Sequence, residues 1–238
     1  MIRDRFRYRE TITTILAEDP THIEAAREGM IAARLEIERY IAGDPFFAAT
    51  FEPYTPKGGG RSISRMADAA FEAGVGPMAA VAGTIAWAGL EAMQDAGAAF
   101  AVIDNGGDIA LLSDRPVRVG IHAGNASVSN RLAFVVPPQA EVLGICTSSA
   151  TVGPSISLGT ADAVTVFSRN VAAADAWATA ICNEVTADGE NLIYARLSDS
   201  RVEGVLAILG EHVQSWGDLP PIVPARVDER LITAGDRV

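Results

Sequence analysis

The chain has 238 residues, of which 49% are hydrophobic, and its 30 acidic and 19 basic side chains give a formal net charge of −11. That size and apolar content suffice for a buried core, and the acidic balance argues against nucleic acid as the main partner, because phosphate backbones require a basic surface. No apolar run reaches membrane-spanning length without glycine or charge, no apolar leader is present, and the 2 cysteines do not make a disulfide framework, so we expect a cytoplasmic protein without a membrane partner.

The first part of the chain predicts a strand and then an amphipathic helix. Apolar residues alternate over 6–17, which is typical of a strand. Asp19 suits the N-cap position, and over 21–42 apolar residues recur at helical spacing with charged residues on the other face. A helix that covers a sheet is expected there. His22, near its start, has no partner pattern and is interpreted as a packing or solvent-facing residue.

Residues 53–64 predict a loop in which three glycines separate Lys57, the only lysine, from Arg61. Backbone N–H groups and basic side chains of such a loop can hold an anionic ligand, and a mobile surface loop is the equal alternative. The spacing of a P-loop is absent. A short helix over 66–73 follows.

The rest of the chain is organised around residues 75–109. Pro77 suits the first position of a helix, about twenty small and apolar residues lead to Gly97, and 100–103 indicates a buried strand. The sequence Asp-Asn-Gly-Gly-Asp at 104–108 then demands a tight turn, because glycine adopts positive φ readily. We predict a buried helix, a strand, and a turn that exposes backbone N–H groups between two carboxylates.

Strands are also expected over 109–113, paired as a hairpin with 100–103, and over 117–123, 131–136, 142–146 and 162–168. His122 is interpreted as a residue on the surface of its sheet. A final amphipathic helix is expected over 202–216, and an edge strand or tail over 220–227. The mixed order of elements, with several adjacent strands, favours an α+β fold with largely antiparallel sheet.

Two groups of polar residues are candidates for a site. Five hydroxyl residues fall within 146–155, directly after a predicted buried strand, where they either turn the backbone or line a polar ligand site. On the predicted helix over 171–183, Asp175 and Thr179 are four residues apart and share one face. Their oxygens suit a hard cation such as Mg²⁺; alternatively Asp175 interacts with the helix N-terminus and Thr179 bonds back to a carbonyl.

At five places, in the same order along the chain, the sequence resembles the uncharacterised branch of the ApbE-like superfamily, whose characterised members are the FAD:protein FMN transferases, once called thiamine-biosynthesis lipoproteins. The motifs lie at 74–83, 105–109, 146–153, 161–166 and 174–180. The resemblance covers a motif-bearing core of about 64–183 within a single domain of residues 1–238.

The resemblance implies an α+β, T-fold-like sandwich of antiparallel sheets with covering helices, and a flavin (FAD or FMN) in a central cleft. It also implies Mg²⁺ held by Asp175 and Thr179 with a backbone carbonyl near Met78 or Ala79, where the metal would assist transfer of FMN to a hydroxyl of a protein substrate. The ligand-binding residues expected on this basis and from the turn and hydroxyl motifs are Asn105, Gly106, Gly107, Asp108, Thr147, Ser148 and Ser149.

The chain also departs from the transferases. Ala79-Ala80-Val81 stands where their central helix carries a lysine, their His-Ile-x-Asp-Pro motif is missing, and Pro154 stands where even the uncharacterised branch usually has a histidine. No general base is evident from the sequence, and the N-terminal lipoprotein cysteine is absent.

Three interpretations follow. The chain is an enzyme that acts on a flavin or another phosphate-bearing ligand, a non-catalytic protein that binds such a ligand, or an accessory protein in sulfur assimilation with Cys146 as its candidate thiol. Cys146 falls on a predicted strand, which favours buried packing instead. A homo-oligomer is compatible with the Ala-rich helices. All of the site predictions require Gly106, Ser148 and Asp175 to converge on one cleft.

Overall fold

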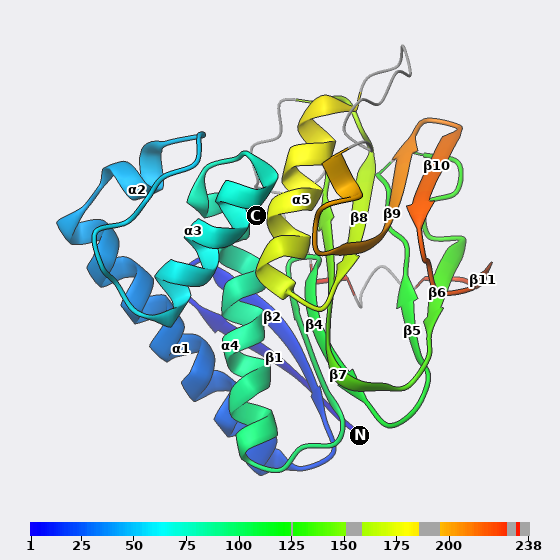
Figure 1. Ribbon diagram of the computed structural model, residues 1–238. Helices are drawn as coiled ribbons and strands as arrows, with labels where there is room; N and C mark the ends of the chain where they lie inside the picture. Colours follow the sequence, from blue (N-terminus) through cyan, green and yellow to red (C-terminus); the bar gives the residue numbers. More distant parts are fainter. Residues whose placement is uncertain (125, 151–158, 186–195, 228–231, 234–238) are drawn as a thin grey trace.

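The computed structural model describes residues 1–124, 126–150, 159–185, 196–227 and 232–233. Two antiparallel sheets form in this part of the chain: an eight-stranded sheet in the order β1-β2-β3-β4-β7-β8-β9-β10 and a three-stranded sheet in the order β11-β6-β5 (Figure 1). The strands of the large sheet are β1 (Ile2–Tyr8), β2 (Thr11–Ala17), β3 (Ala101–Asn105), β4 (Asp108–Ser113), β7 (Gln139–Ser148), β8 (Ala163–Ser168), β9 (Val202–Leu209) and β10 (His212–Gly217). Those of the small sheet are β5 (Val117–Gly120), β6 (Leu132–Val136) and β11 (Ile222–Pro224).

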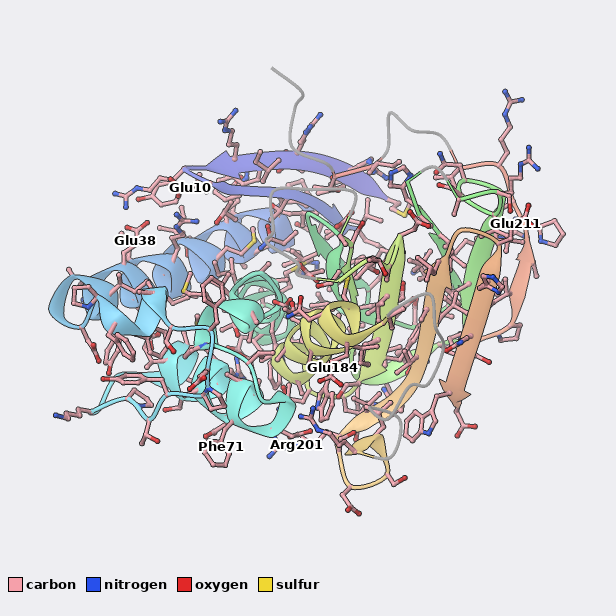
Figure 2. The ribbon with its side chains drawn as sticks, turned by 90° about the horizontal axis from the view of Figure 1, so that it is seen from above. Glu10, Glu38, Phe71, Glu184, Arg201 and Glu211 are labelled. Atoms are coloured by element: carbon pink, nitrogen blue, oxygen red, sulfur yellow. The ribbon has the colours of Figure 1, made fainter. Side chains whose placement is uncertain are left out.

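The helices gather on one face of the large sheet, and the small sheet covers part of the other face (Figures 1 and 2). The α-helices in the described part of the chain include α1 (Pro20–Gly43), α2 (Phe46–Ala49), α3 (Arg61–Ala73), α4 (Val81–Asp95) and α5 (Val171–Glu184). Alternate residues of β3 enter two separate cores: Ile103 packs among helix residues, and Val102 packs with the small sheet. The layered α+β arrangement with antiparallel sheets, expected from the sequence, is confirmed.

The stretch 75–109 forms the predicted helix, strand and turn. Pro77 opens a 3₁₀ turn, Pro77–Ala80, which leads directly into α4. β3 and β4 pair as a hairpin in which Asn105 lies opposite Asp108. The two residues between them, Gly106 and Gly107, have φ of 70° and 109°, and positive φ at both positions matches the right-handed twist of the paired strands.

Helix α1 is also confirmed, and its boundaries have local causes. The Asp19 carboxylate accepts a 2.8 Å hydrogen bond from the backbone N–H of Thr21, and Pro20 occupies the first turn. The apolar stripe, which includes Ile23, Met30 and Ile37, is buried against the sheet and α4. The predicted strands after 109 are present as β4 to β8, with β7 longer than expected.

Three sequence predictions are wrong in detail. Residues 6–17 do not form one strand, because Arg9 adopts φ of 55° and folds β1 back onto β2. The final helix predicted over 202–216 is instead the hairpin β9–β10, closed by Gly210 with φ of 59°. Helix α3 begins at Arg61, inside the predicted loop, because the Glu36 carboxylate accepts hydrogen bonds from the backbone N–H and hydroxyl of Ser62 (3.0 and 2.8 Å).

Candidate functional site

A cavity of about 1160 Å³ lies beside the β3–β4 turn and is lined by both sheets, the 3₁₀ turn and α5. Gly106, Ser148 and Asp175 all lie on its wall, although they come from three different parts of the chain. The three motifs singled out in the sequence therefore meet in one place. Of the candidate hydroxyl stretch, Thr151, Val152 and the positions up to 155 lie outside the described residues.

The β3–β4 turn forms one side of the cavity. Asp104 Oδ1 accepts a hydrogen bond of 2.9 Å from the backbone N–H of Gly107. Asn105 Nδ2 donates to the backbone carbonyl of Ala82 at 3.0 Å, which ties the turn to the start of α4. The expectation of bare N–H groups is thus wrong at Gly107, whose N–H is already bonded, and Gly106 is the exposed residue of the turn.

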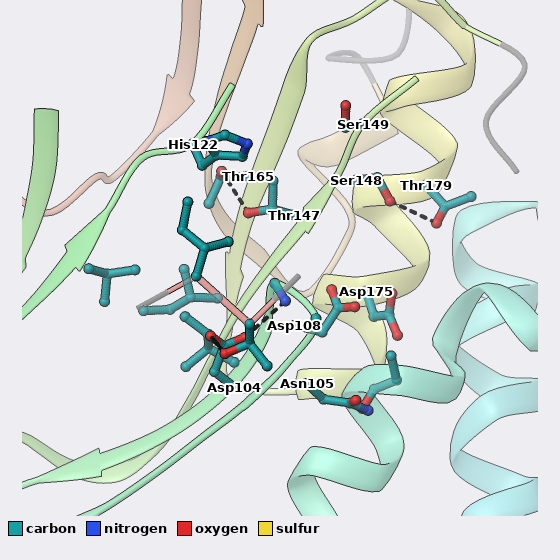
Figure 3. A pocket seen from close by; sticks show the side chains of 18 of the residues that line it. Asp104, Asn105, Asp108, His122, Thr147, Ser148, Ser149, Thr165, Asp175 and Thr179 are labelled. Atoms are coloured by element: carbon teal, nitrogen blue, oxygen red, sulfur yellow. Dashed lines mark hydrogen bonds between the residues drawn. The ribbon is translucent and has the colours of Figure 1, made fainter. Parts of the chain in front are cut away.

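Hydroxyl groups from β7, β8 and α5 form a second side (Figure 3). Ser148 Oγ lies 3.1 Å from Thr179 Oγ1, so the end of β7 is bonded to α5. Thr147 Oγ1 lies 2.9 Å from Thr165 Oγ1 of the neighbouring strand. Ser149 also lines the cavity. The hydroxyl of Thr179 meets Ser148, rather than bonding back to a carbonyl of its own helix.

Carboxylates form the floor, and their environment is unusual. Asp175 is 6% exposed and accepts a 2.8 Å hydrogen bond from the backbone N–H of Gly83. Burial, and then the charge of Asp108, hold the pKa of Asp175 well above its ordinary value. Burial, and then the charge of Asp104, raise the pKa of Asp108 to about 7. The Oδ1 atom of Asp108 is buried without a hydrogen-bond partner, so this floor favours either a proton or a bound cation.

The residues expected to hold Mg²⁺ all belong to this cavity. Asp175, Thr179, Met78 and Ala79 all line the cavity. Among the described residues, no group of three or more His, Cys, Asp or Glu side chains is placed to hold a metal ion. A cation here would depend on one carboxylate, a hydroxyl and a backbone carbonyl, with water and ligand oxygens completing its shell, which is a donor set that suits Mg²⁺. The unpartnered oxygen of Asp108 is consistent with this fit.

Several residues that line the cavity were not identified from the sequence, because they do not belong to a short motif. The His122 side chain lies on the cavity wall with Nδ1 3.0 Å from Asn130 Oδ1, although its strand position suggested only sheet surface. The others are Arg3, Phe51, Thr165 and Thr233. Side chains alternate between the two faces of a strand, and β2 pairs with both β1 and β3. This alternation could have placed Arg3 on the same face of the sheet as Asp104.

Two other candidates from the sequence, the basic loop and the Cys146 thiol, do not contribute to this site. Lys57 and Arg61 do not line the cavity, and the N-terminus of α3 beside them already holds the carboxylate of Glu36. Cys146 is fully buried, its Sγ lies 3.6 Å from the carbonyl oxygen of Val171, and burial raises the pKa of its thiol well above the ordinary value. A neutral, enclosed thiol is a poor nucleophile.

Within the described residues, no single helix is long and apolar enough to cross a membrane. Helix α3 and the following segment Pro77–Asp95 are together long and apolar enough, but the chain bends by 108° between them.

A family model described as "AbpE bacteria" matches residues 3–203. The chain belongs to this ApbE-like family. Curated relatives extend the match over the whole length: the UPF0280 protein of Methanoregula boonei is 64% identical over 239 residues, covering 100% of both chains. The UPF0280 protein of Methanoculleus marisnigri is 67% identical over 235 residues, covering 99% of this chain and 96% of the relative.

Solved structures agree on the fold of this ApbE-like chain. The apo crystal structure of the flavinyl transferase ApbE from Pseudomonas stutzeri is 14% identical and superposes with a TM-score of 0.52 over 98% of each chain. The flavin transferase ApbE from Vibrio cholerae is 13% identical, with a TM-score of 0.51 over 94% of this chain and 96% of that one. At such identities the likeness establishes the shared architecture.

Proposed function

We infer that the cavity binds a flavin nucleotide, such as FAD, or another phosphate-bearing ligand, together with a divalent cation at Asp175 and Thr179. The observation that carries this proposal is the floor of buried carboxylates, where one oxygen of Asp108 has no partner. Burial and the charge of Asp108 raise the pKa of Asp175, and burial and the charge of Asp104 raise that of Asp108. A cation would relieve this repulsion and at the same time neutralise ligand phosphates. The glycine turn and the hydroxyl groups then provide hydrogen bonds to the rest of the ligand.

The structural neighbours are named flavin transferases, which supports flavin as the ligand class. A protein hydroxyl as the acceptor is what the family resemblance implies. The pocket volume of about 1160 Å³ leaves room for a dinucleotide. We propose FMN transfer as the reaction class, with Asn105, Gly106 and Ser148 positioning the ligand and a pocket carboxylate accepting the hydroxyl proton.

A thermal-shift experiment tests ligand and cation together. FAD with MgCl₂ is expected to raise the melting temperature of the purified chain by several degrees, because a ligand that binds only the folded state stabilises it. Asp175→Asn should lose most of that shift, whereas Asp68→Asn, at an exposed site on α3 outside the cavity, should keep it. An unchanged melting temperature with FAD, FMN and ADP, with and without magnesium, would overturn the proposal.

The second candidate function is binding without transfer, and it is favoured by the absence of lysine from the segment 76–83. The two functions differ in their products. Transfer releases AMP from FAD and leaves covalent flavin on a protein, whereas binding alone leaves FAD intact. Chromatography of the nucleotides after incubation therefore separates them.

A further inference from the structure

A threonine from the C-terminal part of the chain lies inside the cavity. Ile232 and Thr233 both line its wall, and Thr233 is 3% exposed. The carbonyl oxygen of Thr233 lies 3.9 Å from the position that a Cβ on Gly106 would take, so this segment meets the glycine turn directly. Nothing in the sequence motifs marks Thr233.

The contacts of the Thr233 hydroxyl distinguish it from the other hydroxyls described in the cavity. Its Oγ1 lies 2.5 Å from Asp104 Oδ2, to which it donates, and 2.8 Å from Thr14 Oγ1. Asp104 and Thr14 are directly opposite each other on β3 and β2, so the sheet fixes both partners. By contrast, the pairs Thr147–Thr165 and Ser148–Thr179 join neutral hydroxyls.

A hydroxyl that donates to a carboxylate is a nucleophile already in contact with its base. Asp104 is held in place by the N–H of Gly107 on its other oxygen. Burial raises the pKa of Asp104 above the ordinary value, which brings it closer to that of an effective proton acceptor near neutral pH. The adjacent turn, Gly106–Gly107, is the element assigned above to the ligand.

We propose that Thr233 is a site of self-modification, at which the chain accepts a nucleotidyl group from a dinucleotide diphosphate such as FAD bound in the cavity. This rests on the proposed function, because it requires a phosphate-bearing ligand beside the turn. Thr233 Oγ1 forms a bond to the flavin-side phosphorus, and the bond between that phosphorus and the bridging oxygen breaks. AMP leaves with the electron pair, and the hydroxyl proton passes to Asp104. The product is a phosphoester between FMN and Thr233, with no change of oxidation state.

The experiment incubates the full chain with FAD and MgCl₂, denatures it, and measures covalent flavin by in-gel fluorescence and peptide mass spectrometry. Noncovalent binding is followed in parallel by the FAD-dependent thermal shift. The wild type and Thr233→Ser should each gain one flavin on residue 233. Thr233→Val should bind FAD and stay unlabelled. Thr160→Val, at an exposed threonine outside the cavity, should label as the wild type does.

Asp104→Asn tests the base. Its labelling rate should fall by about tenfold or more, while FAD still shifts its melting temperature. Wild-type protein that binds FAD without labelling, labelling that persists in Thr233→Val, or flavin found on Thr14 would each overturn the self-modification. A wild type that binds no FAD at all would overturn the proposed function and, with it, this inference.

Discussion

Asp175 on α5 accepts a hydrogen bond of 2.8 Å from the backbone N–H of Gly83 on α4, and this contact holds two helices together at the floor of the cavity. Gly83 allows it because the helices touch there. A Cβ on Gly83 would lie 2.9 Å from both the carbonyl oxygen of Val171 and Cβ of Asp175. The orientation of the Asp175 carboxylate therefore depends on a residue without a side chain, 92 positions earlier in the chain.

Gly83→Ala should destabilise the protein by about 1–3 kcal/mol, because the added methyl group meets backbone that cannot easily move. Urea denaturation measures the change. Gly43→Ala is the matched control, since a Cβ at this helical glycine would meet nothing within 4 Å; it should leave stability unchanged or raise it slightly. Equal stability of the Gly83 variant and the wild type would show that α4 and α5 can separate at no cost.

The unfolding free energy should fall as pH rises from about 4 to about 7. Asp108 has a folded-state pKa of about 7 against an ordinary value of 3.8, so the folded state binds more protons than the unfolded state in that window. The stabilisation by protonated Asp108 is complete at pH values below its pKa in the unfolded state. It is lost as the pH rises through its pKa in the folded state. The raised pKa values of Asp104 and Asp175 act in the same direction.

Asp108→Asn should flatten this pH dependence and give a higher melting temperature than the wild type at pH 8, by about 2–4 °C for each kcal/mol of repulsion removed. Thermal denaturation at pH 5 and pH 8 provides the measurement. The exposed-site variant Asp68→Asn should keep the wild-type slope. A wild type that becomes more stable between pH 5 and 8 would contradict the assignment of these carboxylates.

Two equally exposed phenylalanines, one in the cavity and one outside it, test whether contact with the cavity matters for ligand binding. Phe51 is 70% exposed and lines the cavity, whereas Phe71 is 71% exposed and points outward from α3 (Figure 2). Stacking of a ligand ring on Phe51 contributes about 0.5–1.5 kcal/mol. Phe51→Ala should therefore weaken FAD binding by roughly 2- to 12-fold in a fluorescence titration, and Phe71→Ala should not change it. Equal affinities for both variants would place the flavin ring elsewhere.

Two arginines share one glutamate and should differ sharply in their contribution to stability. Arg65 makes two hydrogen bonds to Glu91 (2.6 and 2.8 Å), its Cζ lies 3.7 Å from the Trp87 ring centroid, and its side chain is 12% exposed. Arg61 is 70% exposed beside the same carboxylate. Arg65→Ala should cost about 1–3 kcal/mol and Arg61→Ala less than about 1 kcal/mol, as measured by urea denaturation. The reverse order would refute this reading.

The fold was predictable where local signals agree with tertiary contacts. Asp19 and Pro20 mark the start of α1, and the paired glycines at 106–107 mark the β3–β4 turn. The β9–β10 hairpin was missed because β9 is buried on both faces, so its apolar residues do not alternate and also fit helical spacing. The turn at Arg9 was missed because a non-glycine residue takes positive φ there.

The site was predictable only as far as its motifs are continuous in sequence. The turn at 104–108, the hydroxyls from Thr147 and the pair Asp175–Thr179 were found, since each combines polar residues with an apolar element. Phe51 and Thr233 were not found, because each belongs to the cavity only through contacts between distant segments. Sheet registers that are not visible in the sequence decide such contacts.

The pairing of Thr233 with Thr14 joins residues separated by 219 positions, and it has a consequence for the order of events in the cell. Domains acquire their contacts as the chain emerges during synthesis. The wall at Asp104 can be completed only after residue 233 has left the ribosome, so a nascent chain that has already formed the β1–β2 hairpin still presents an unfinished cavity.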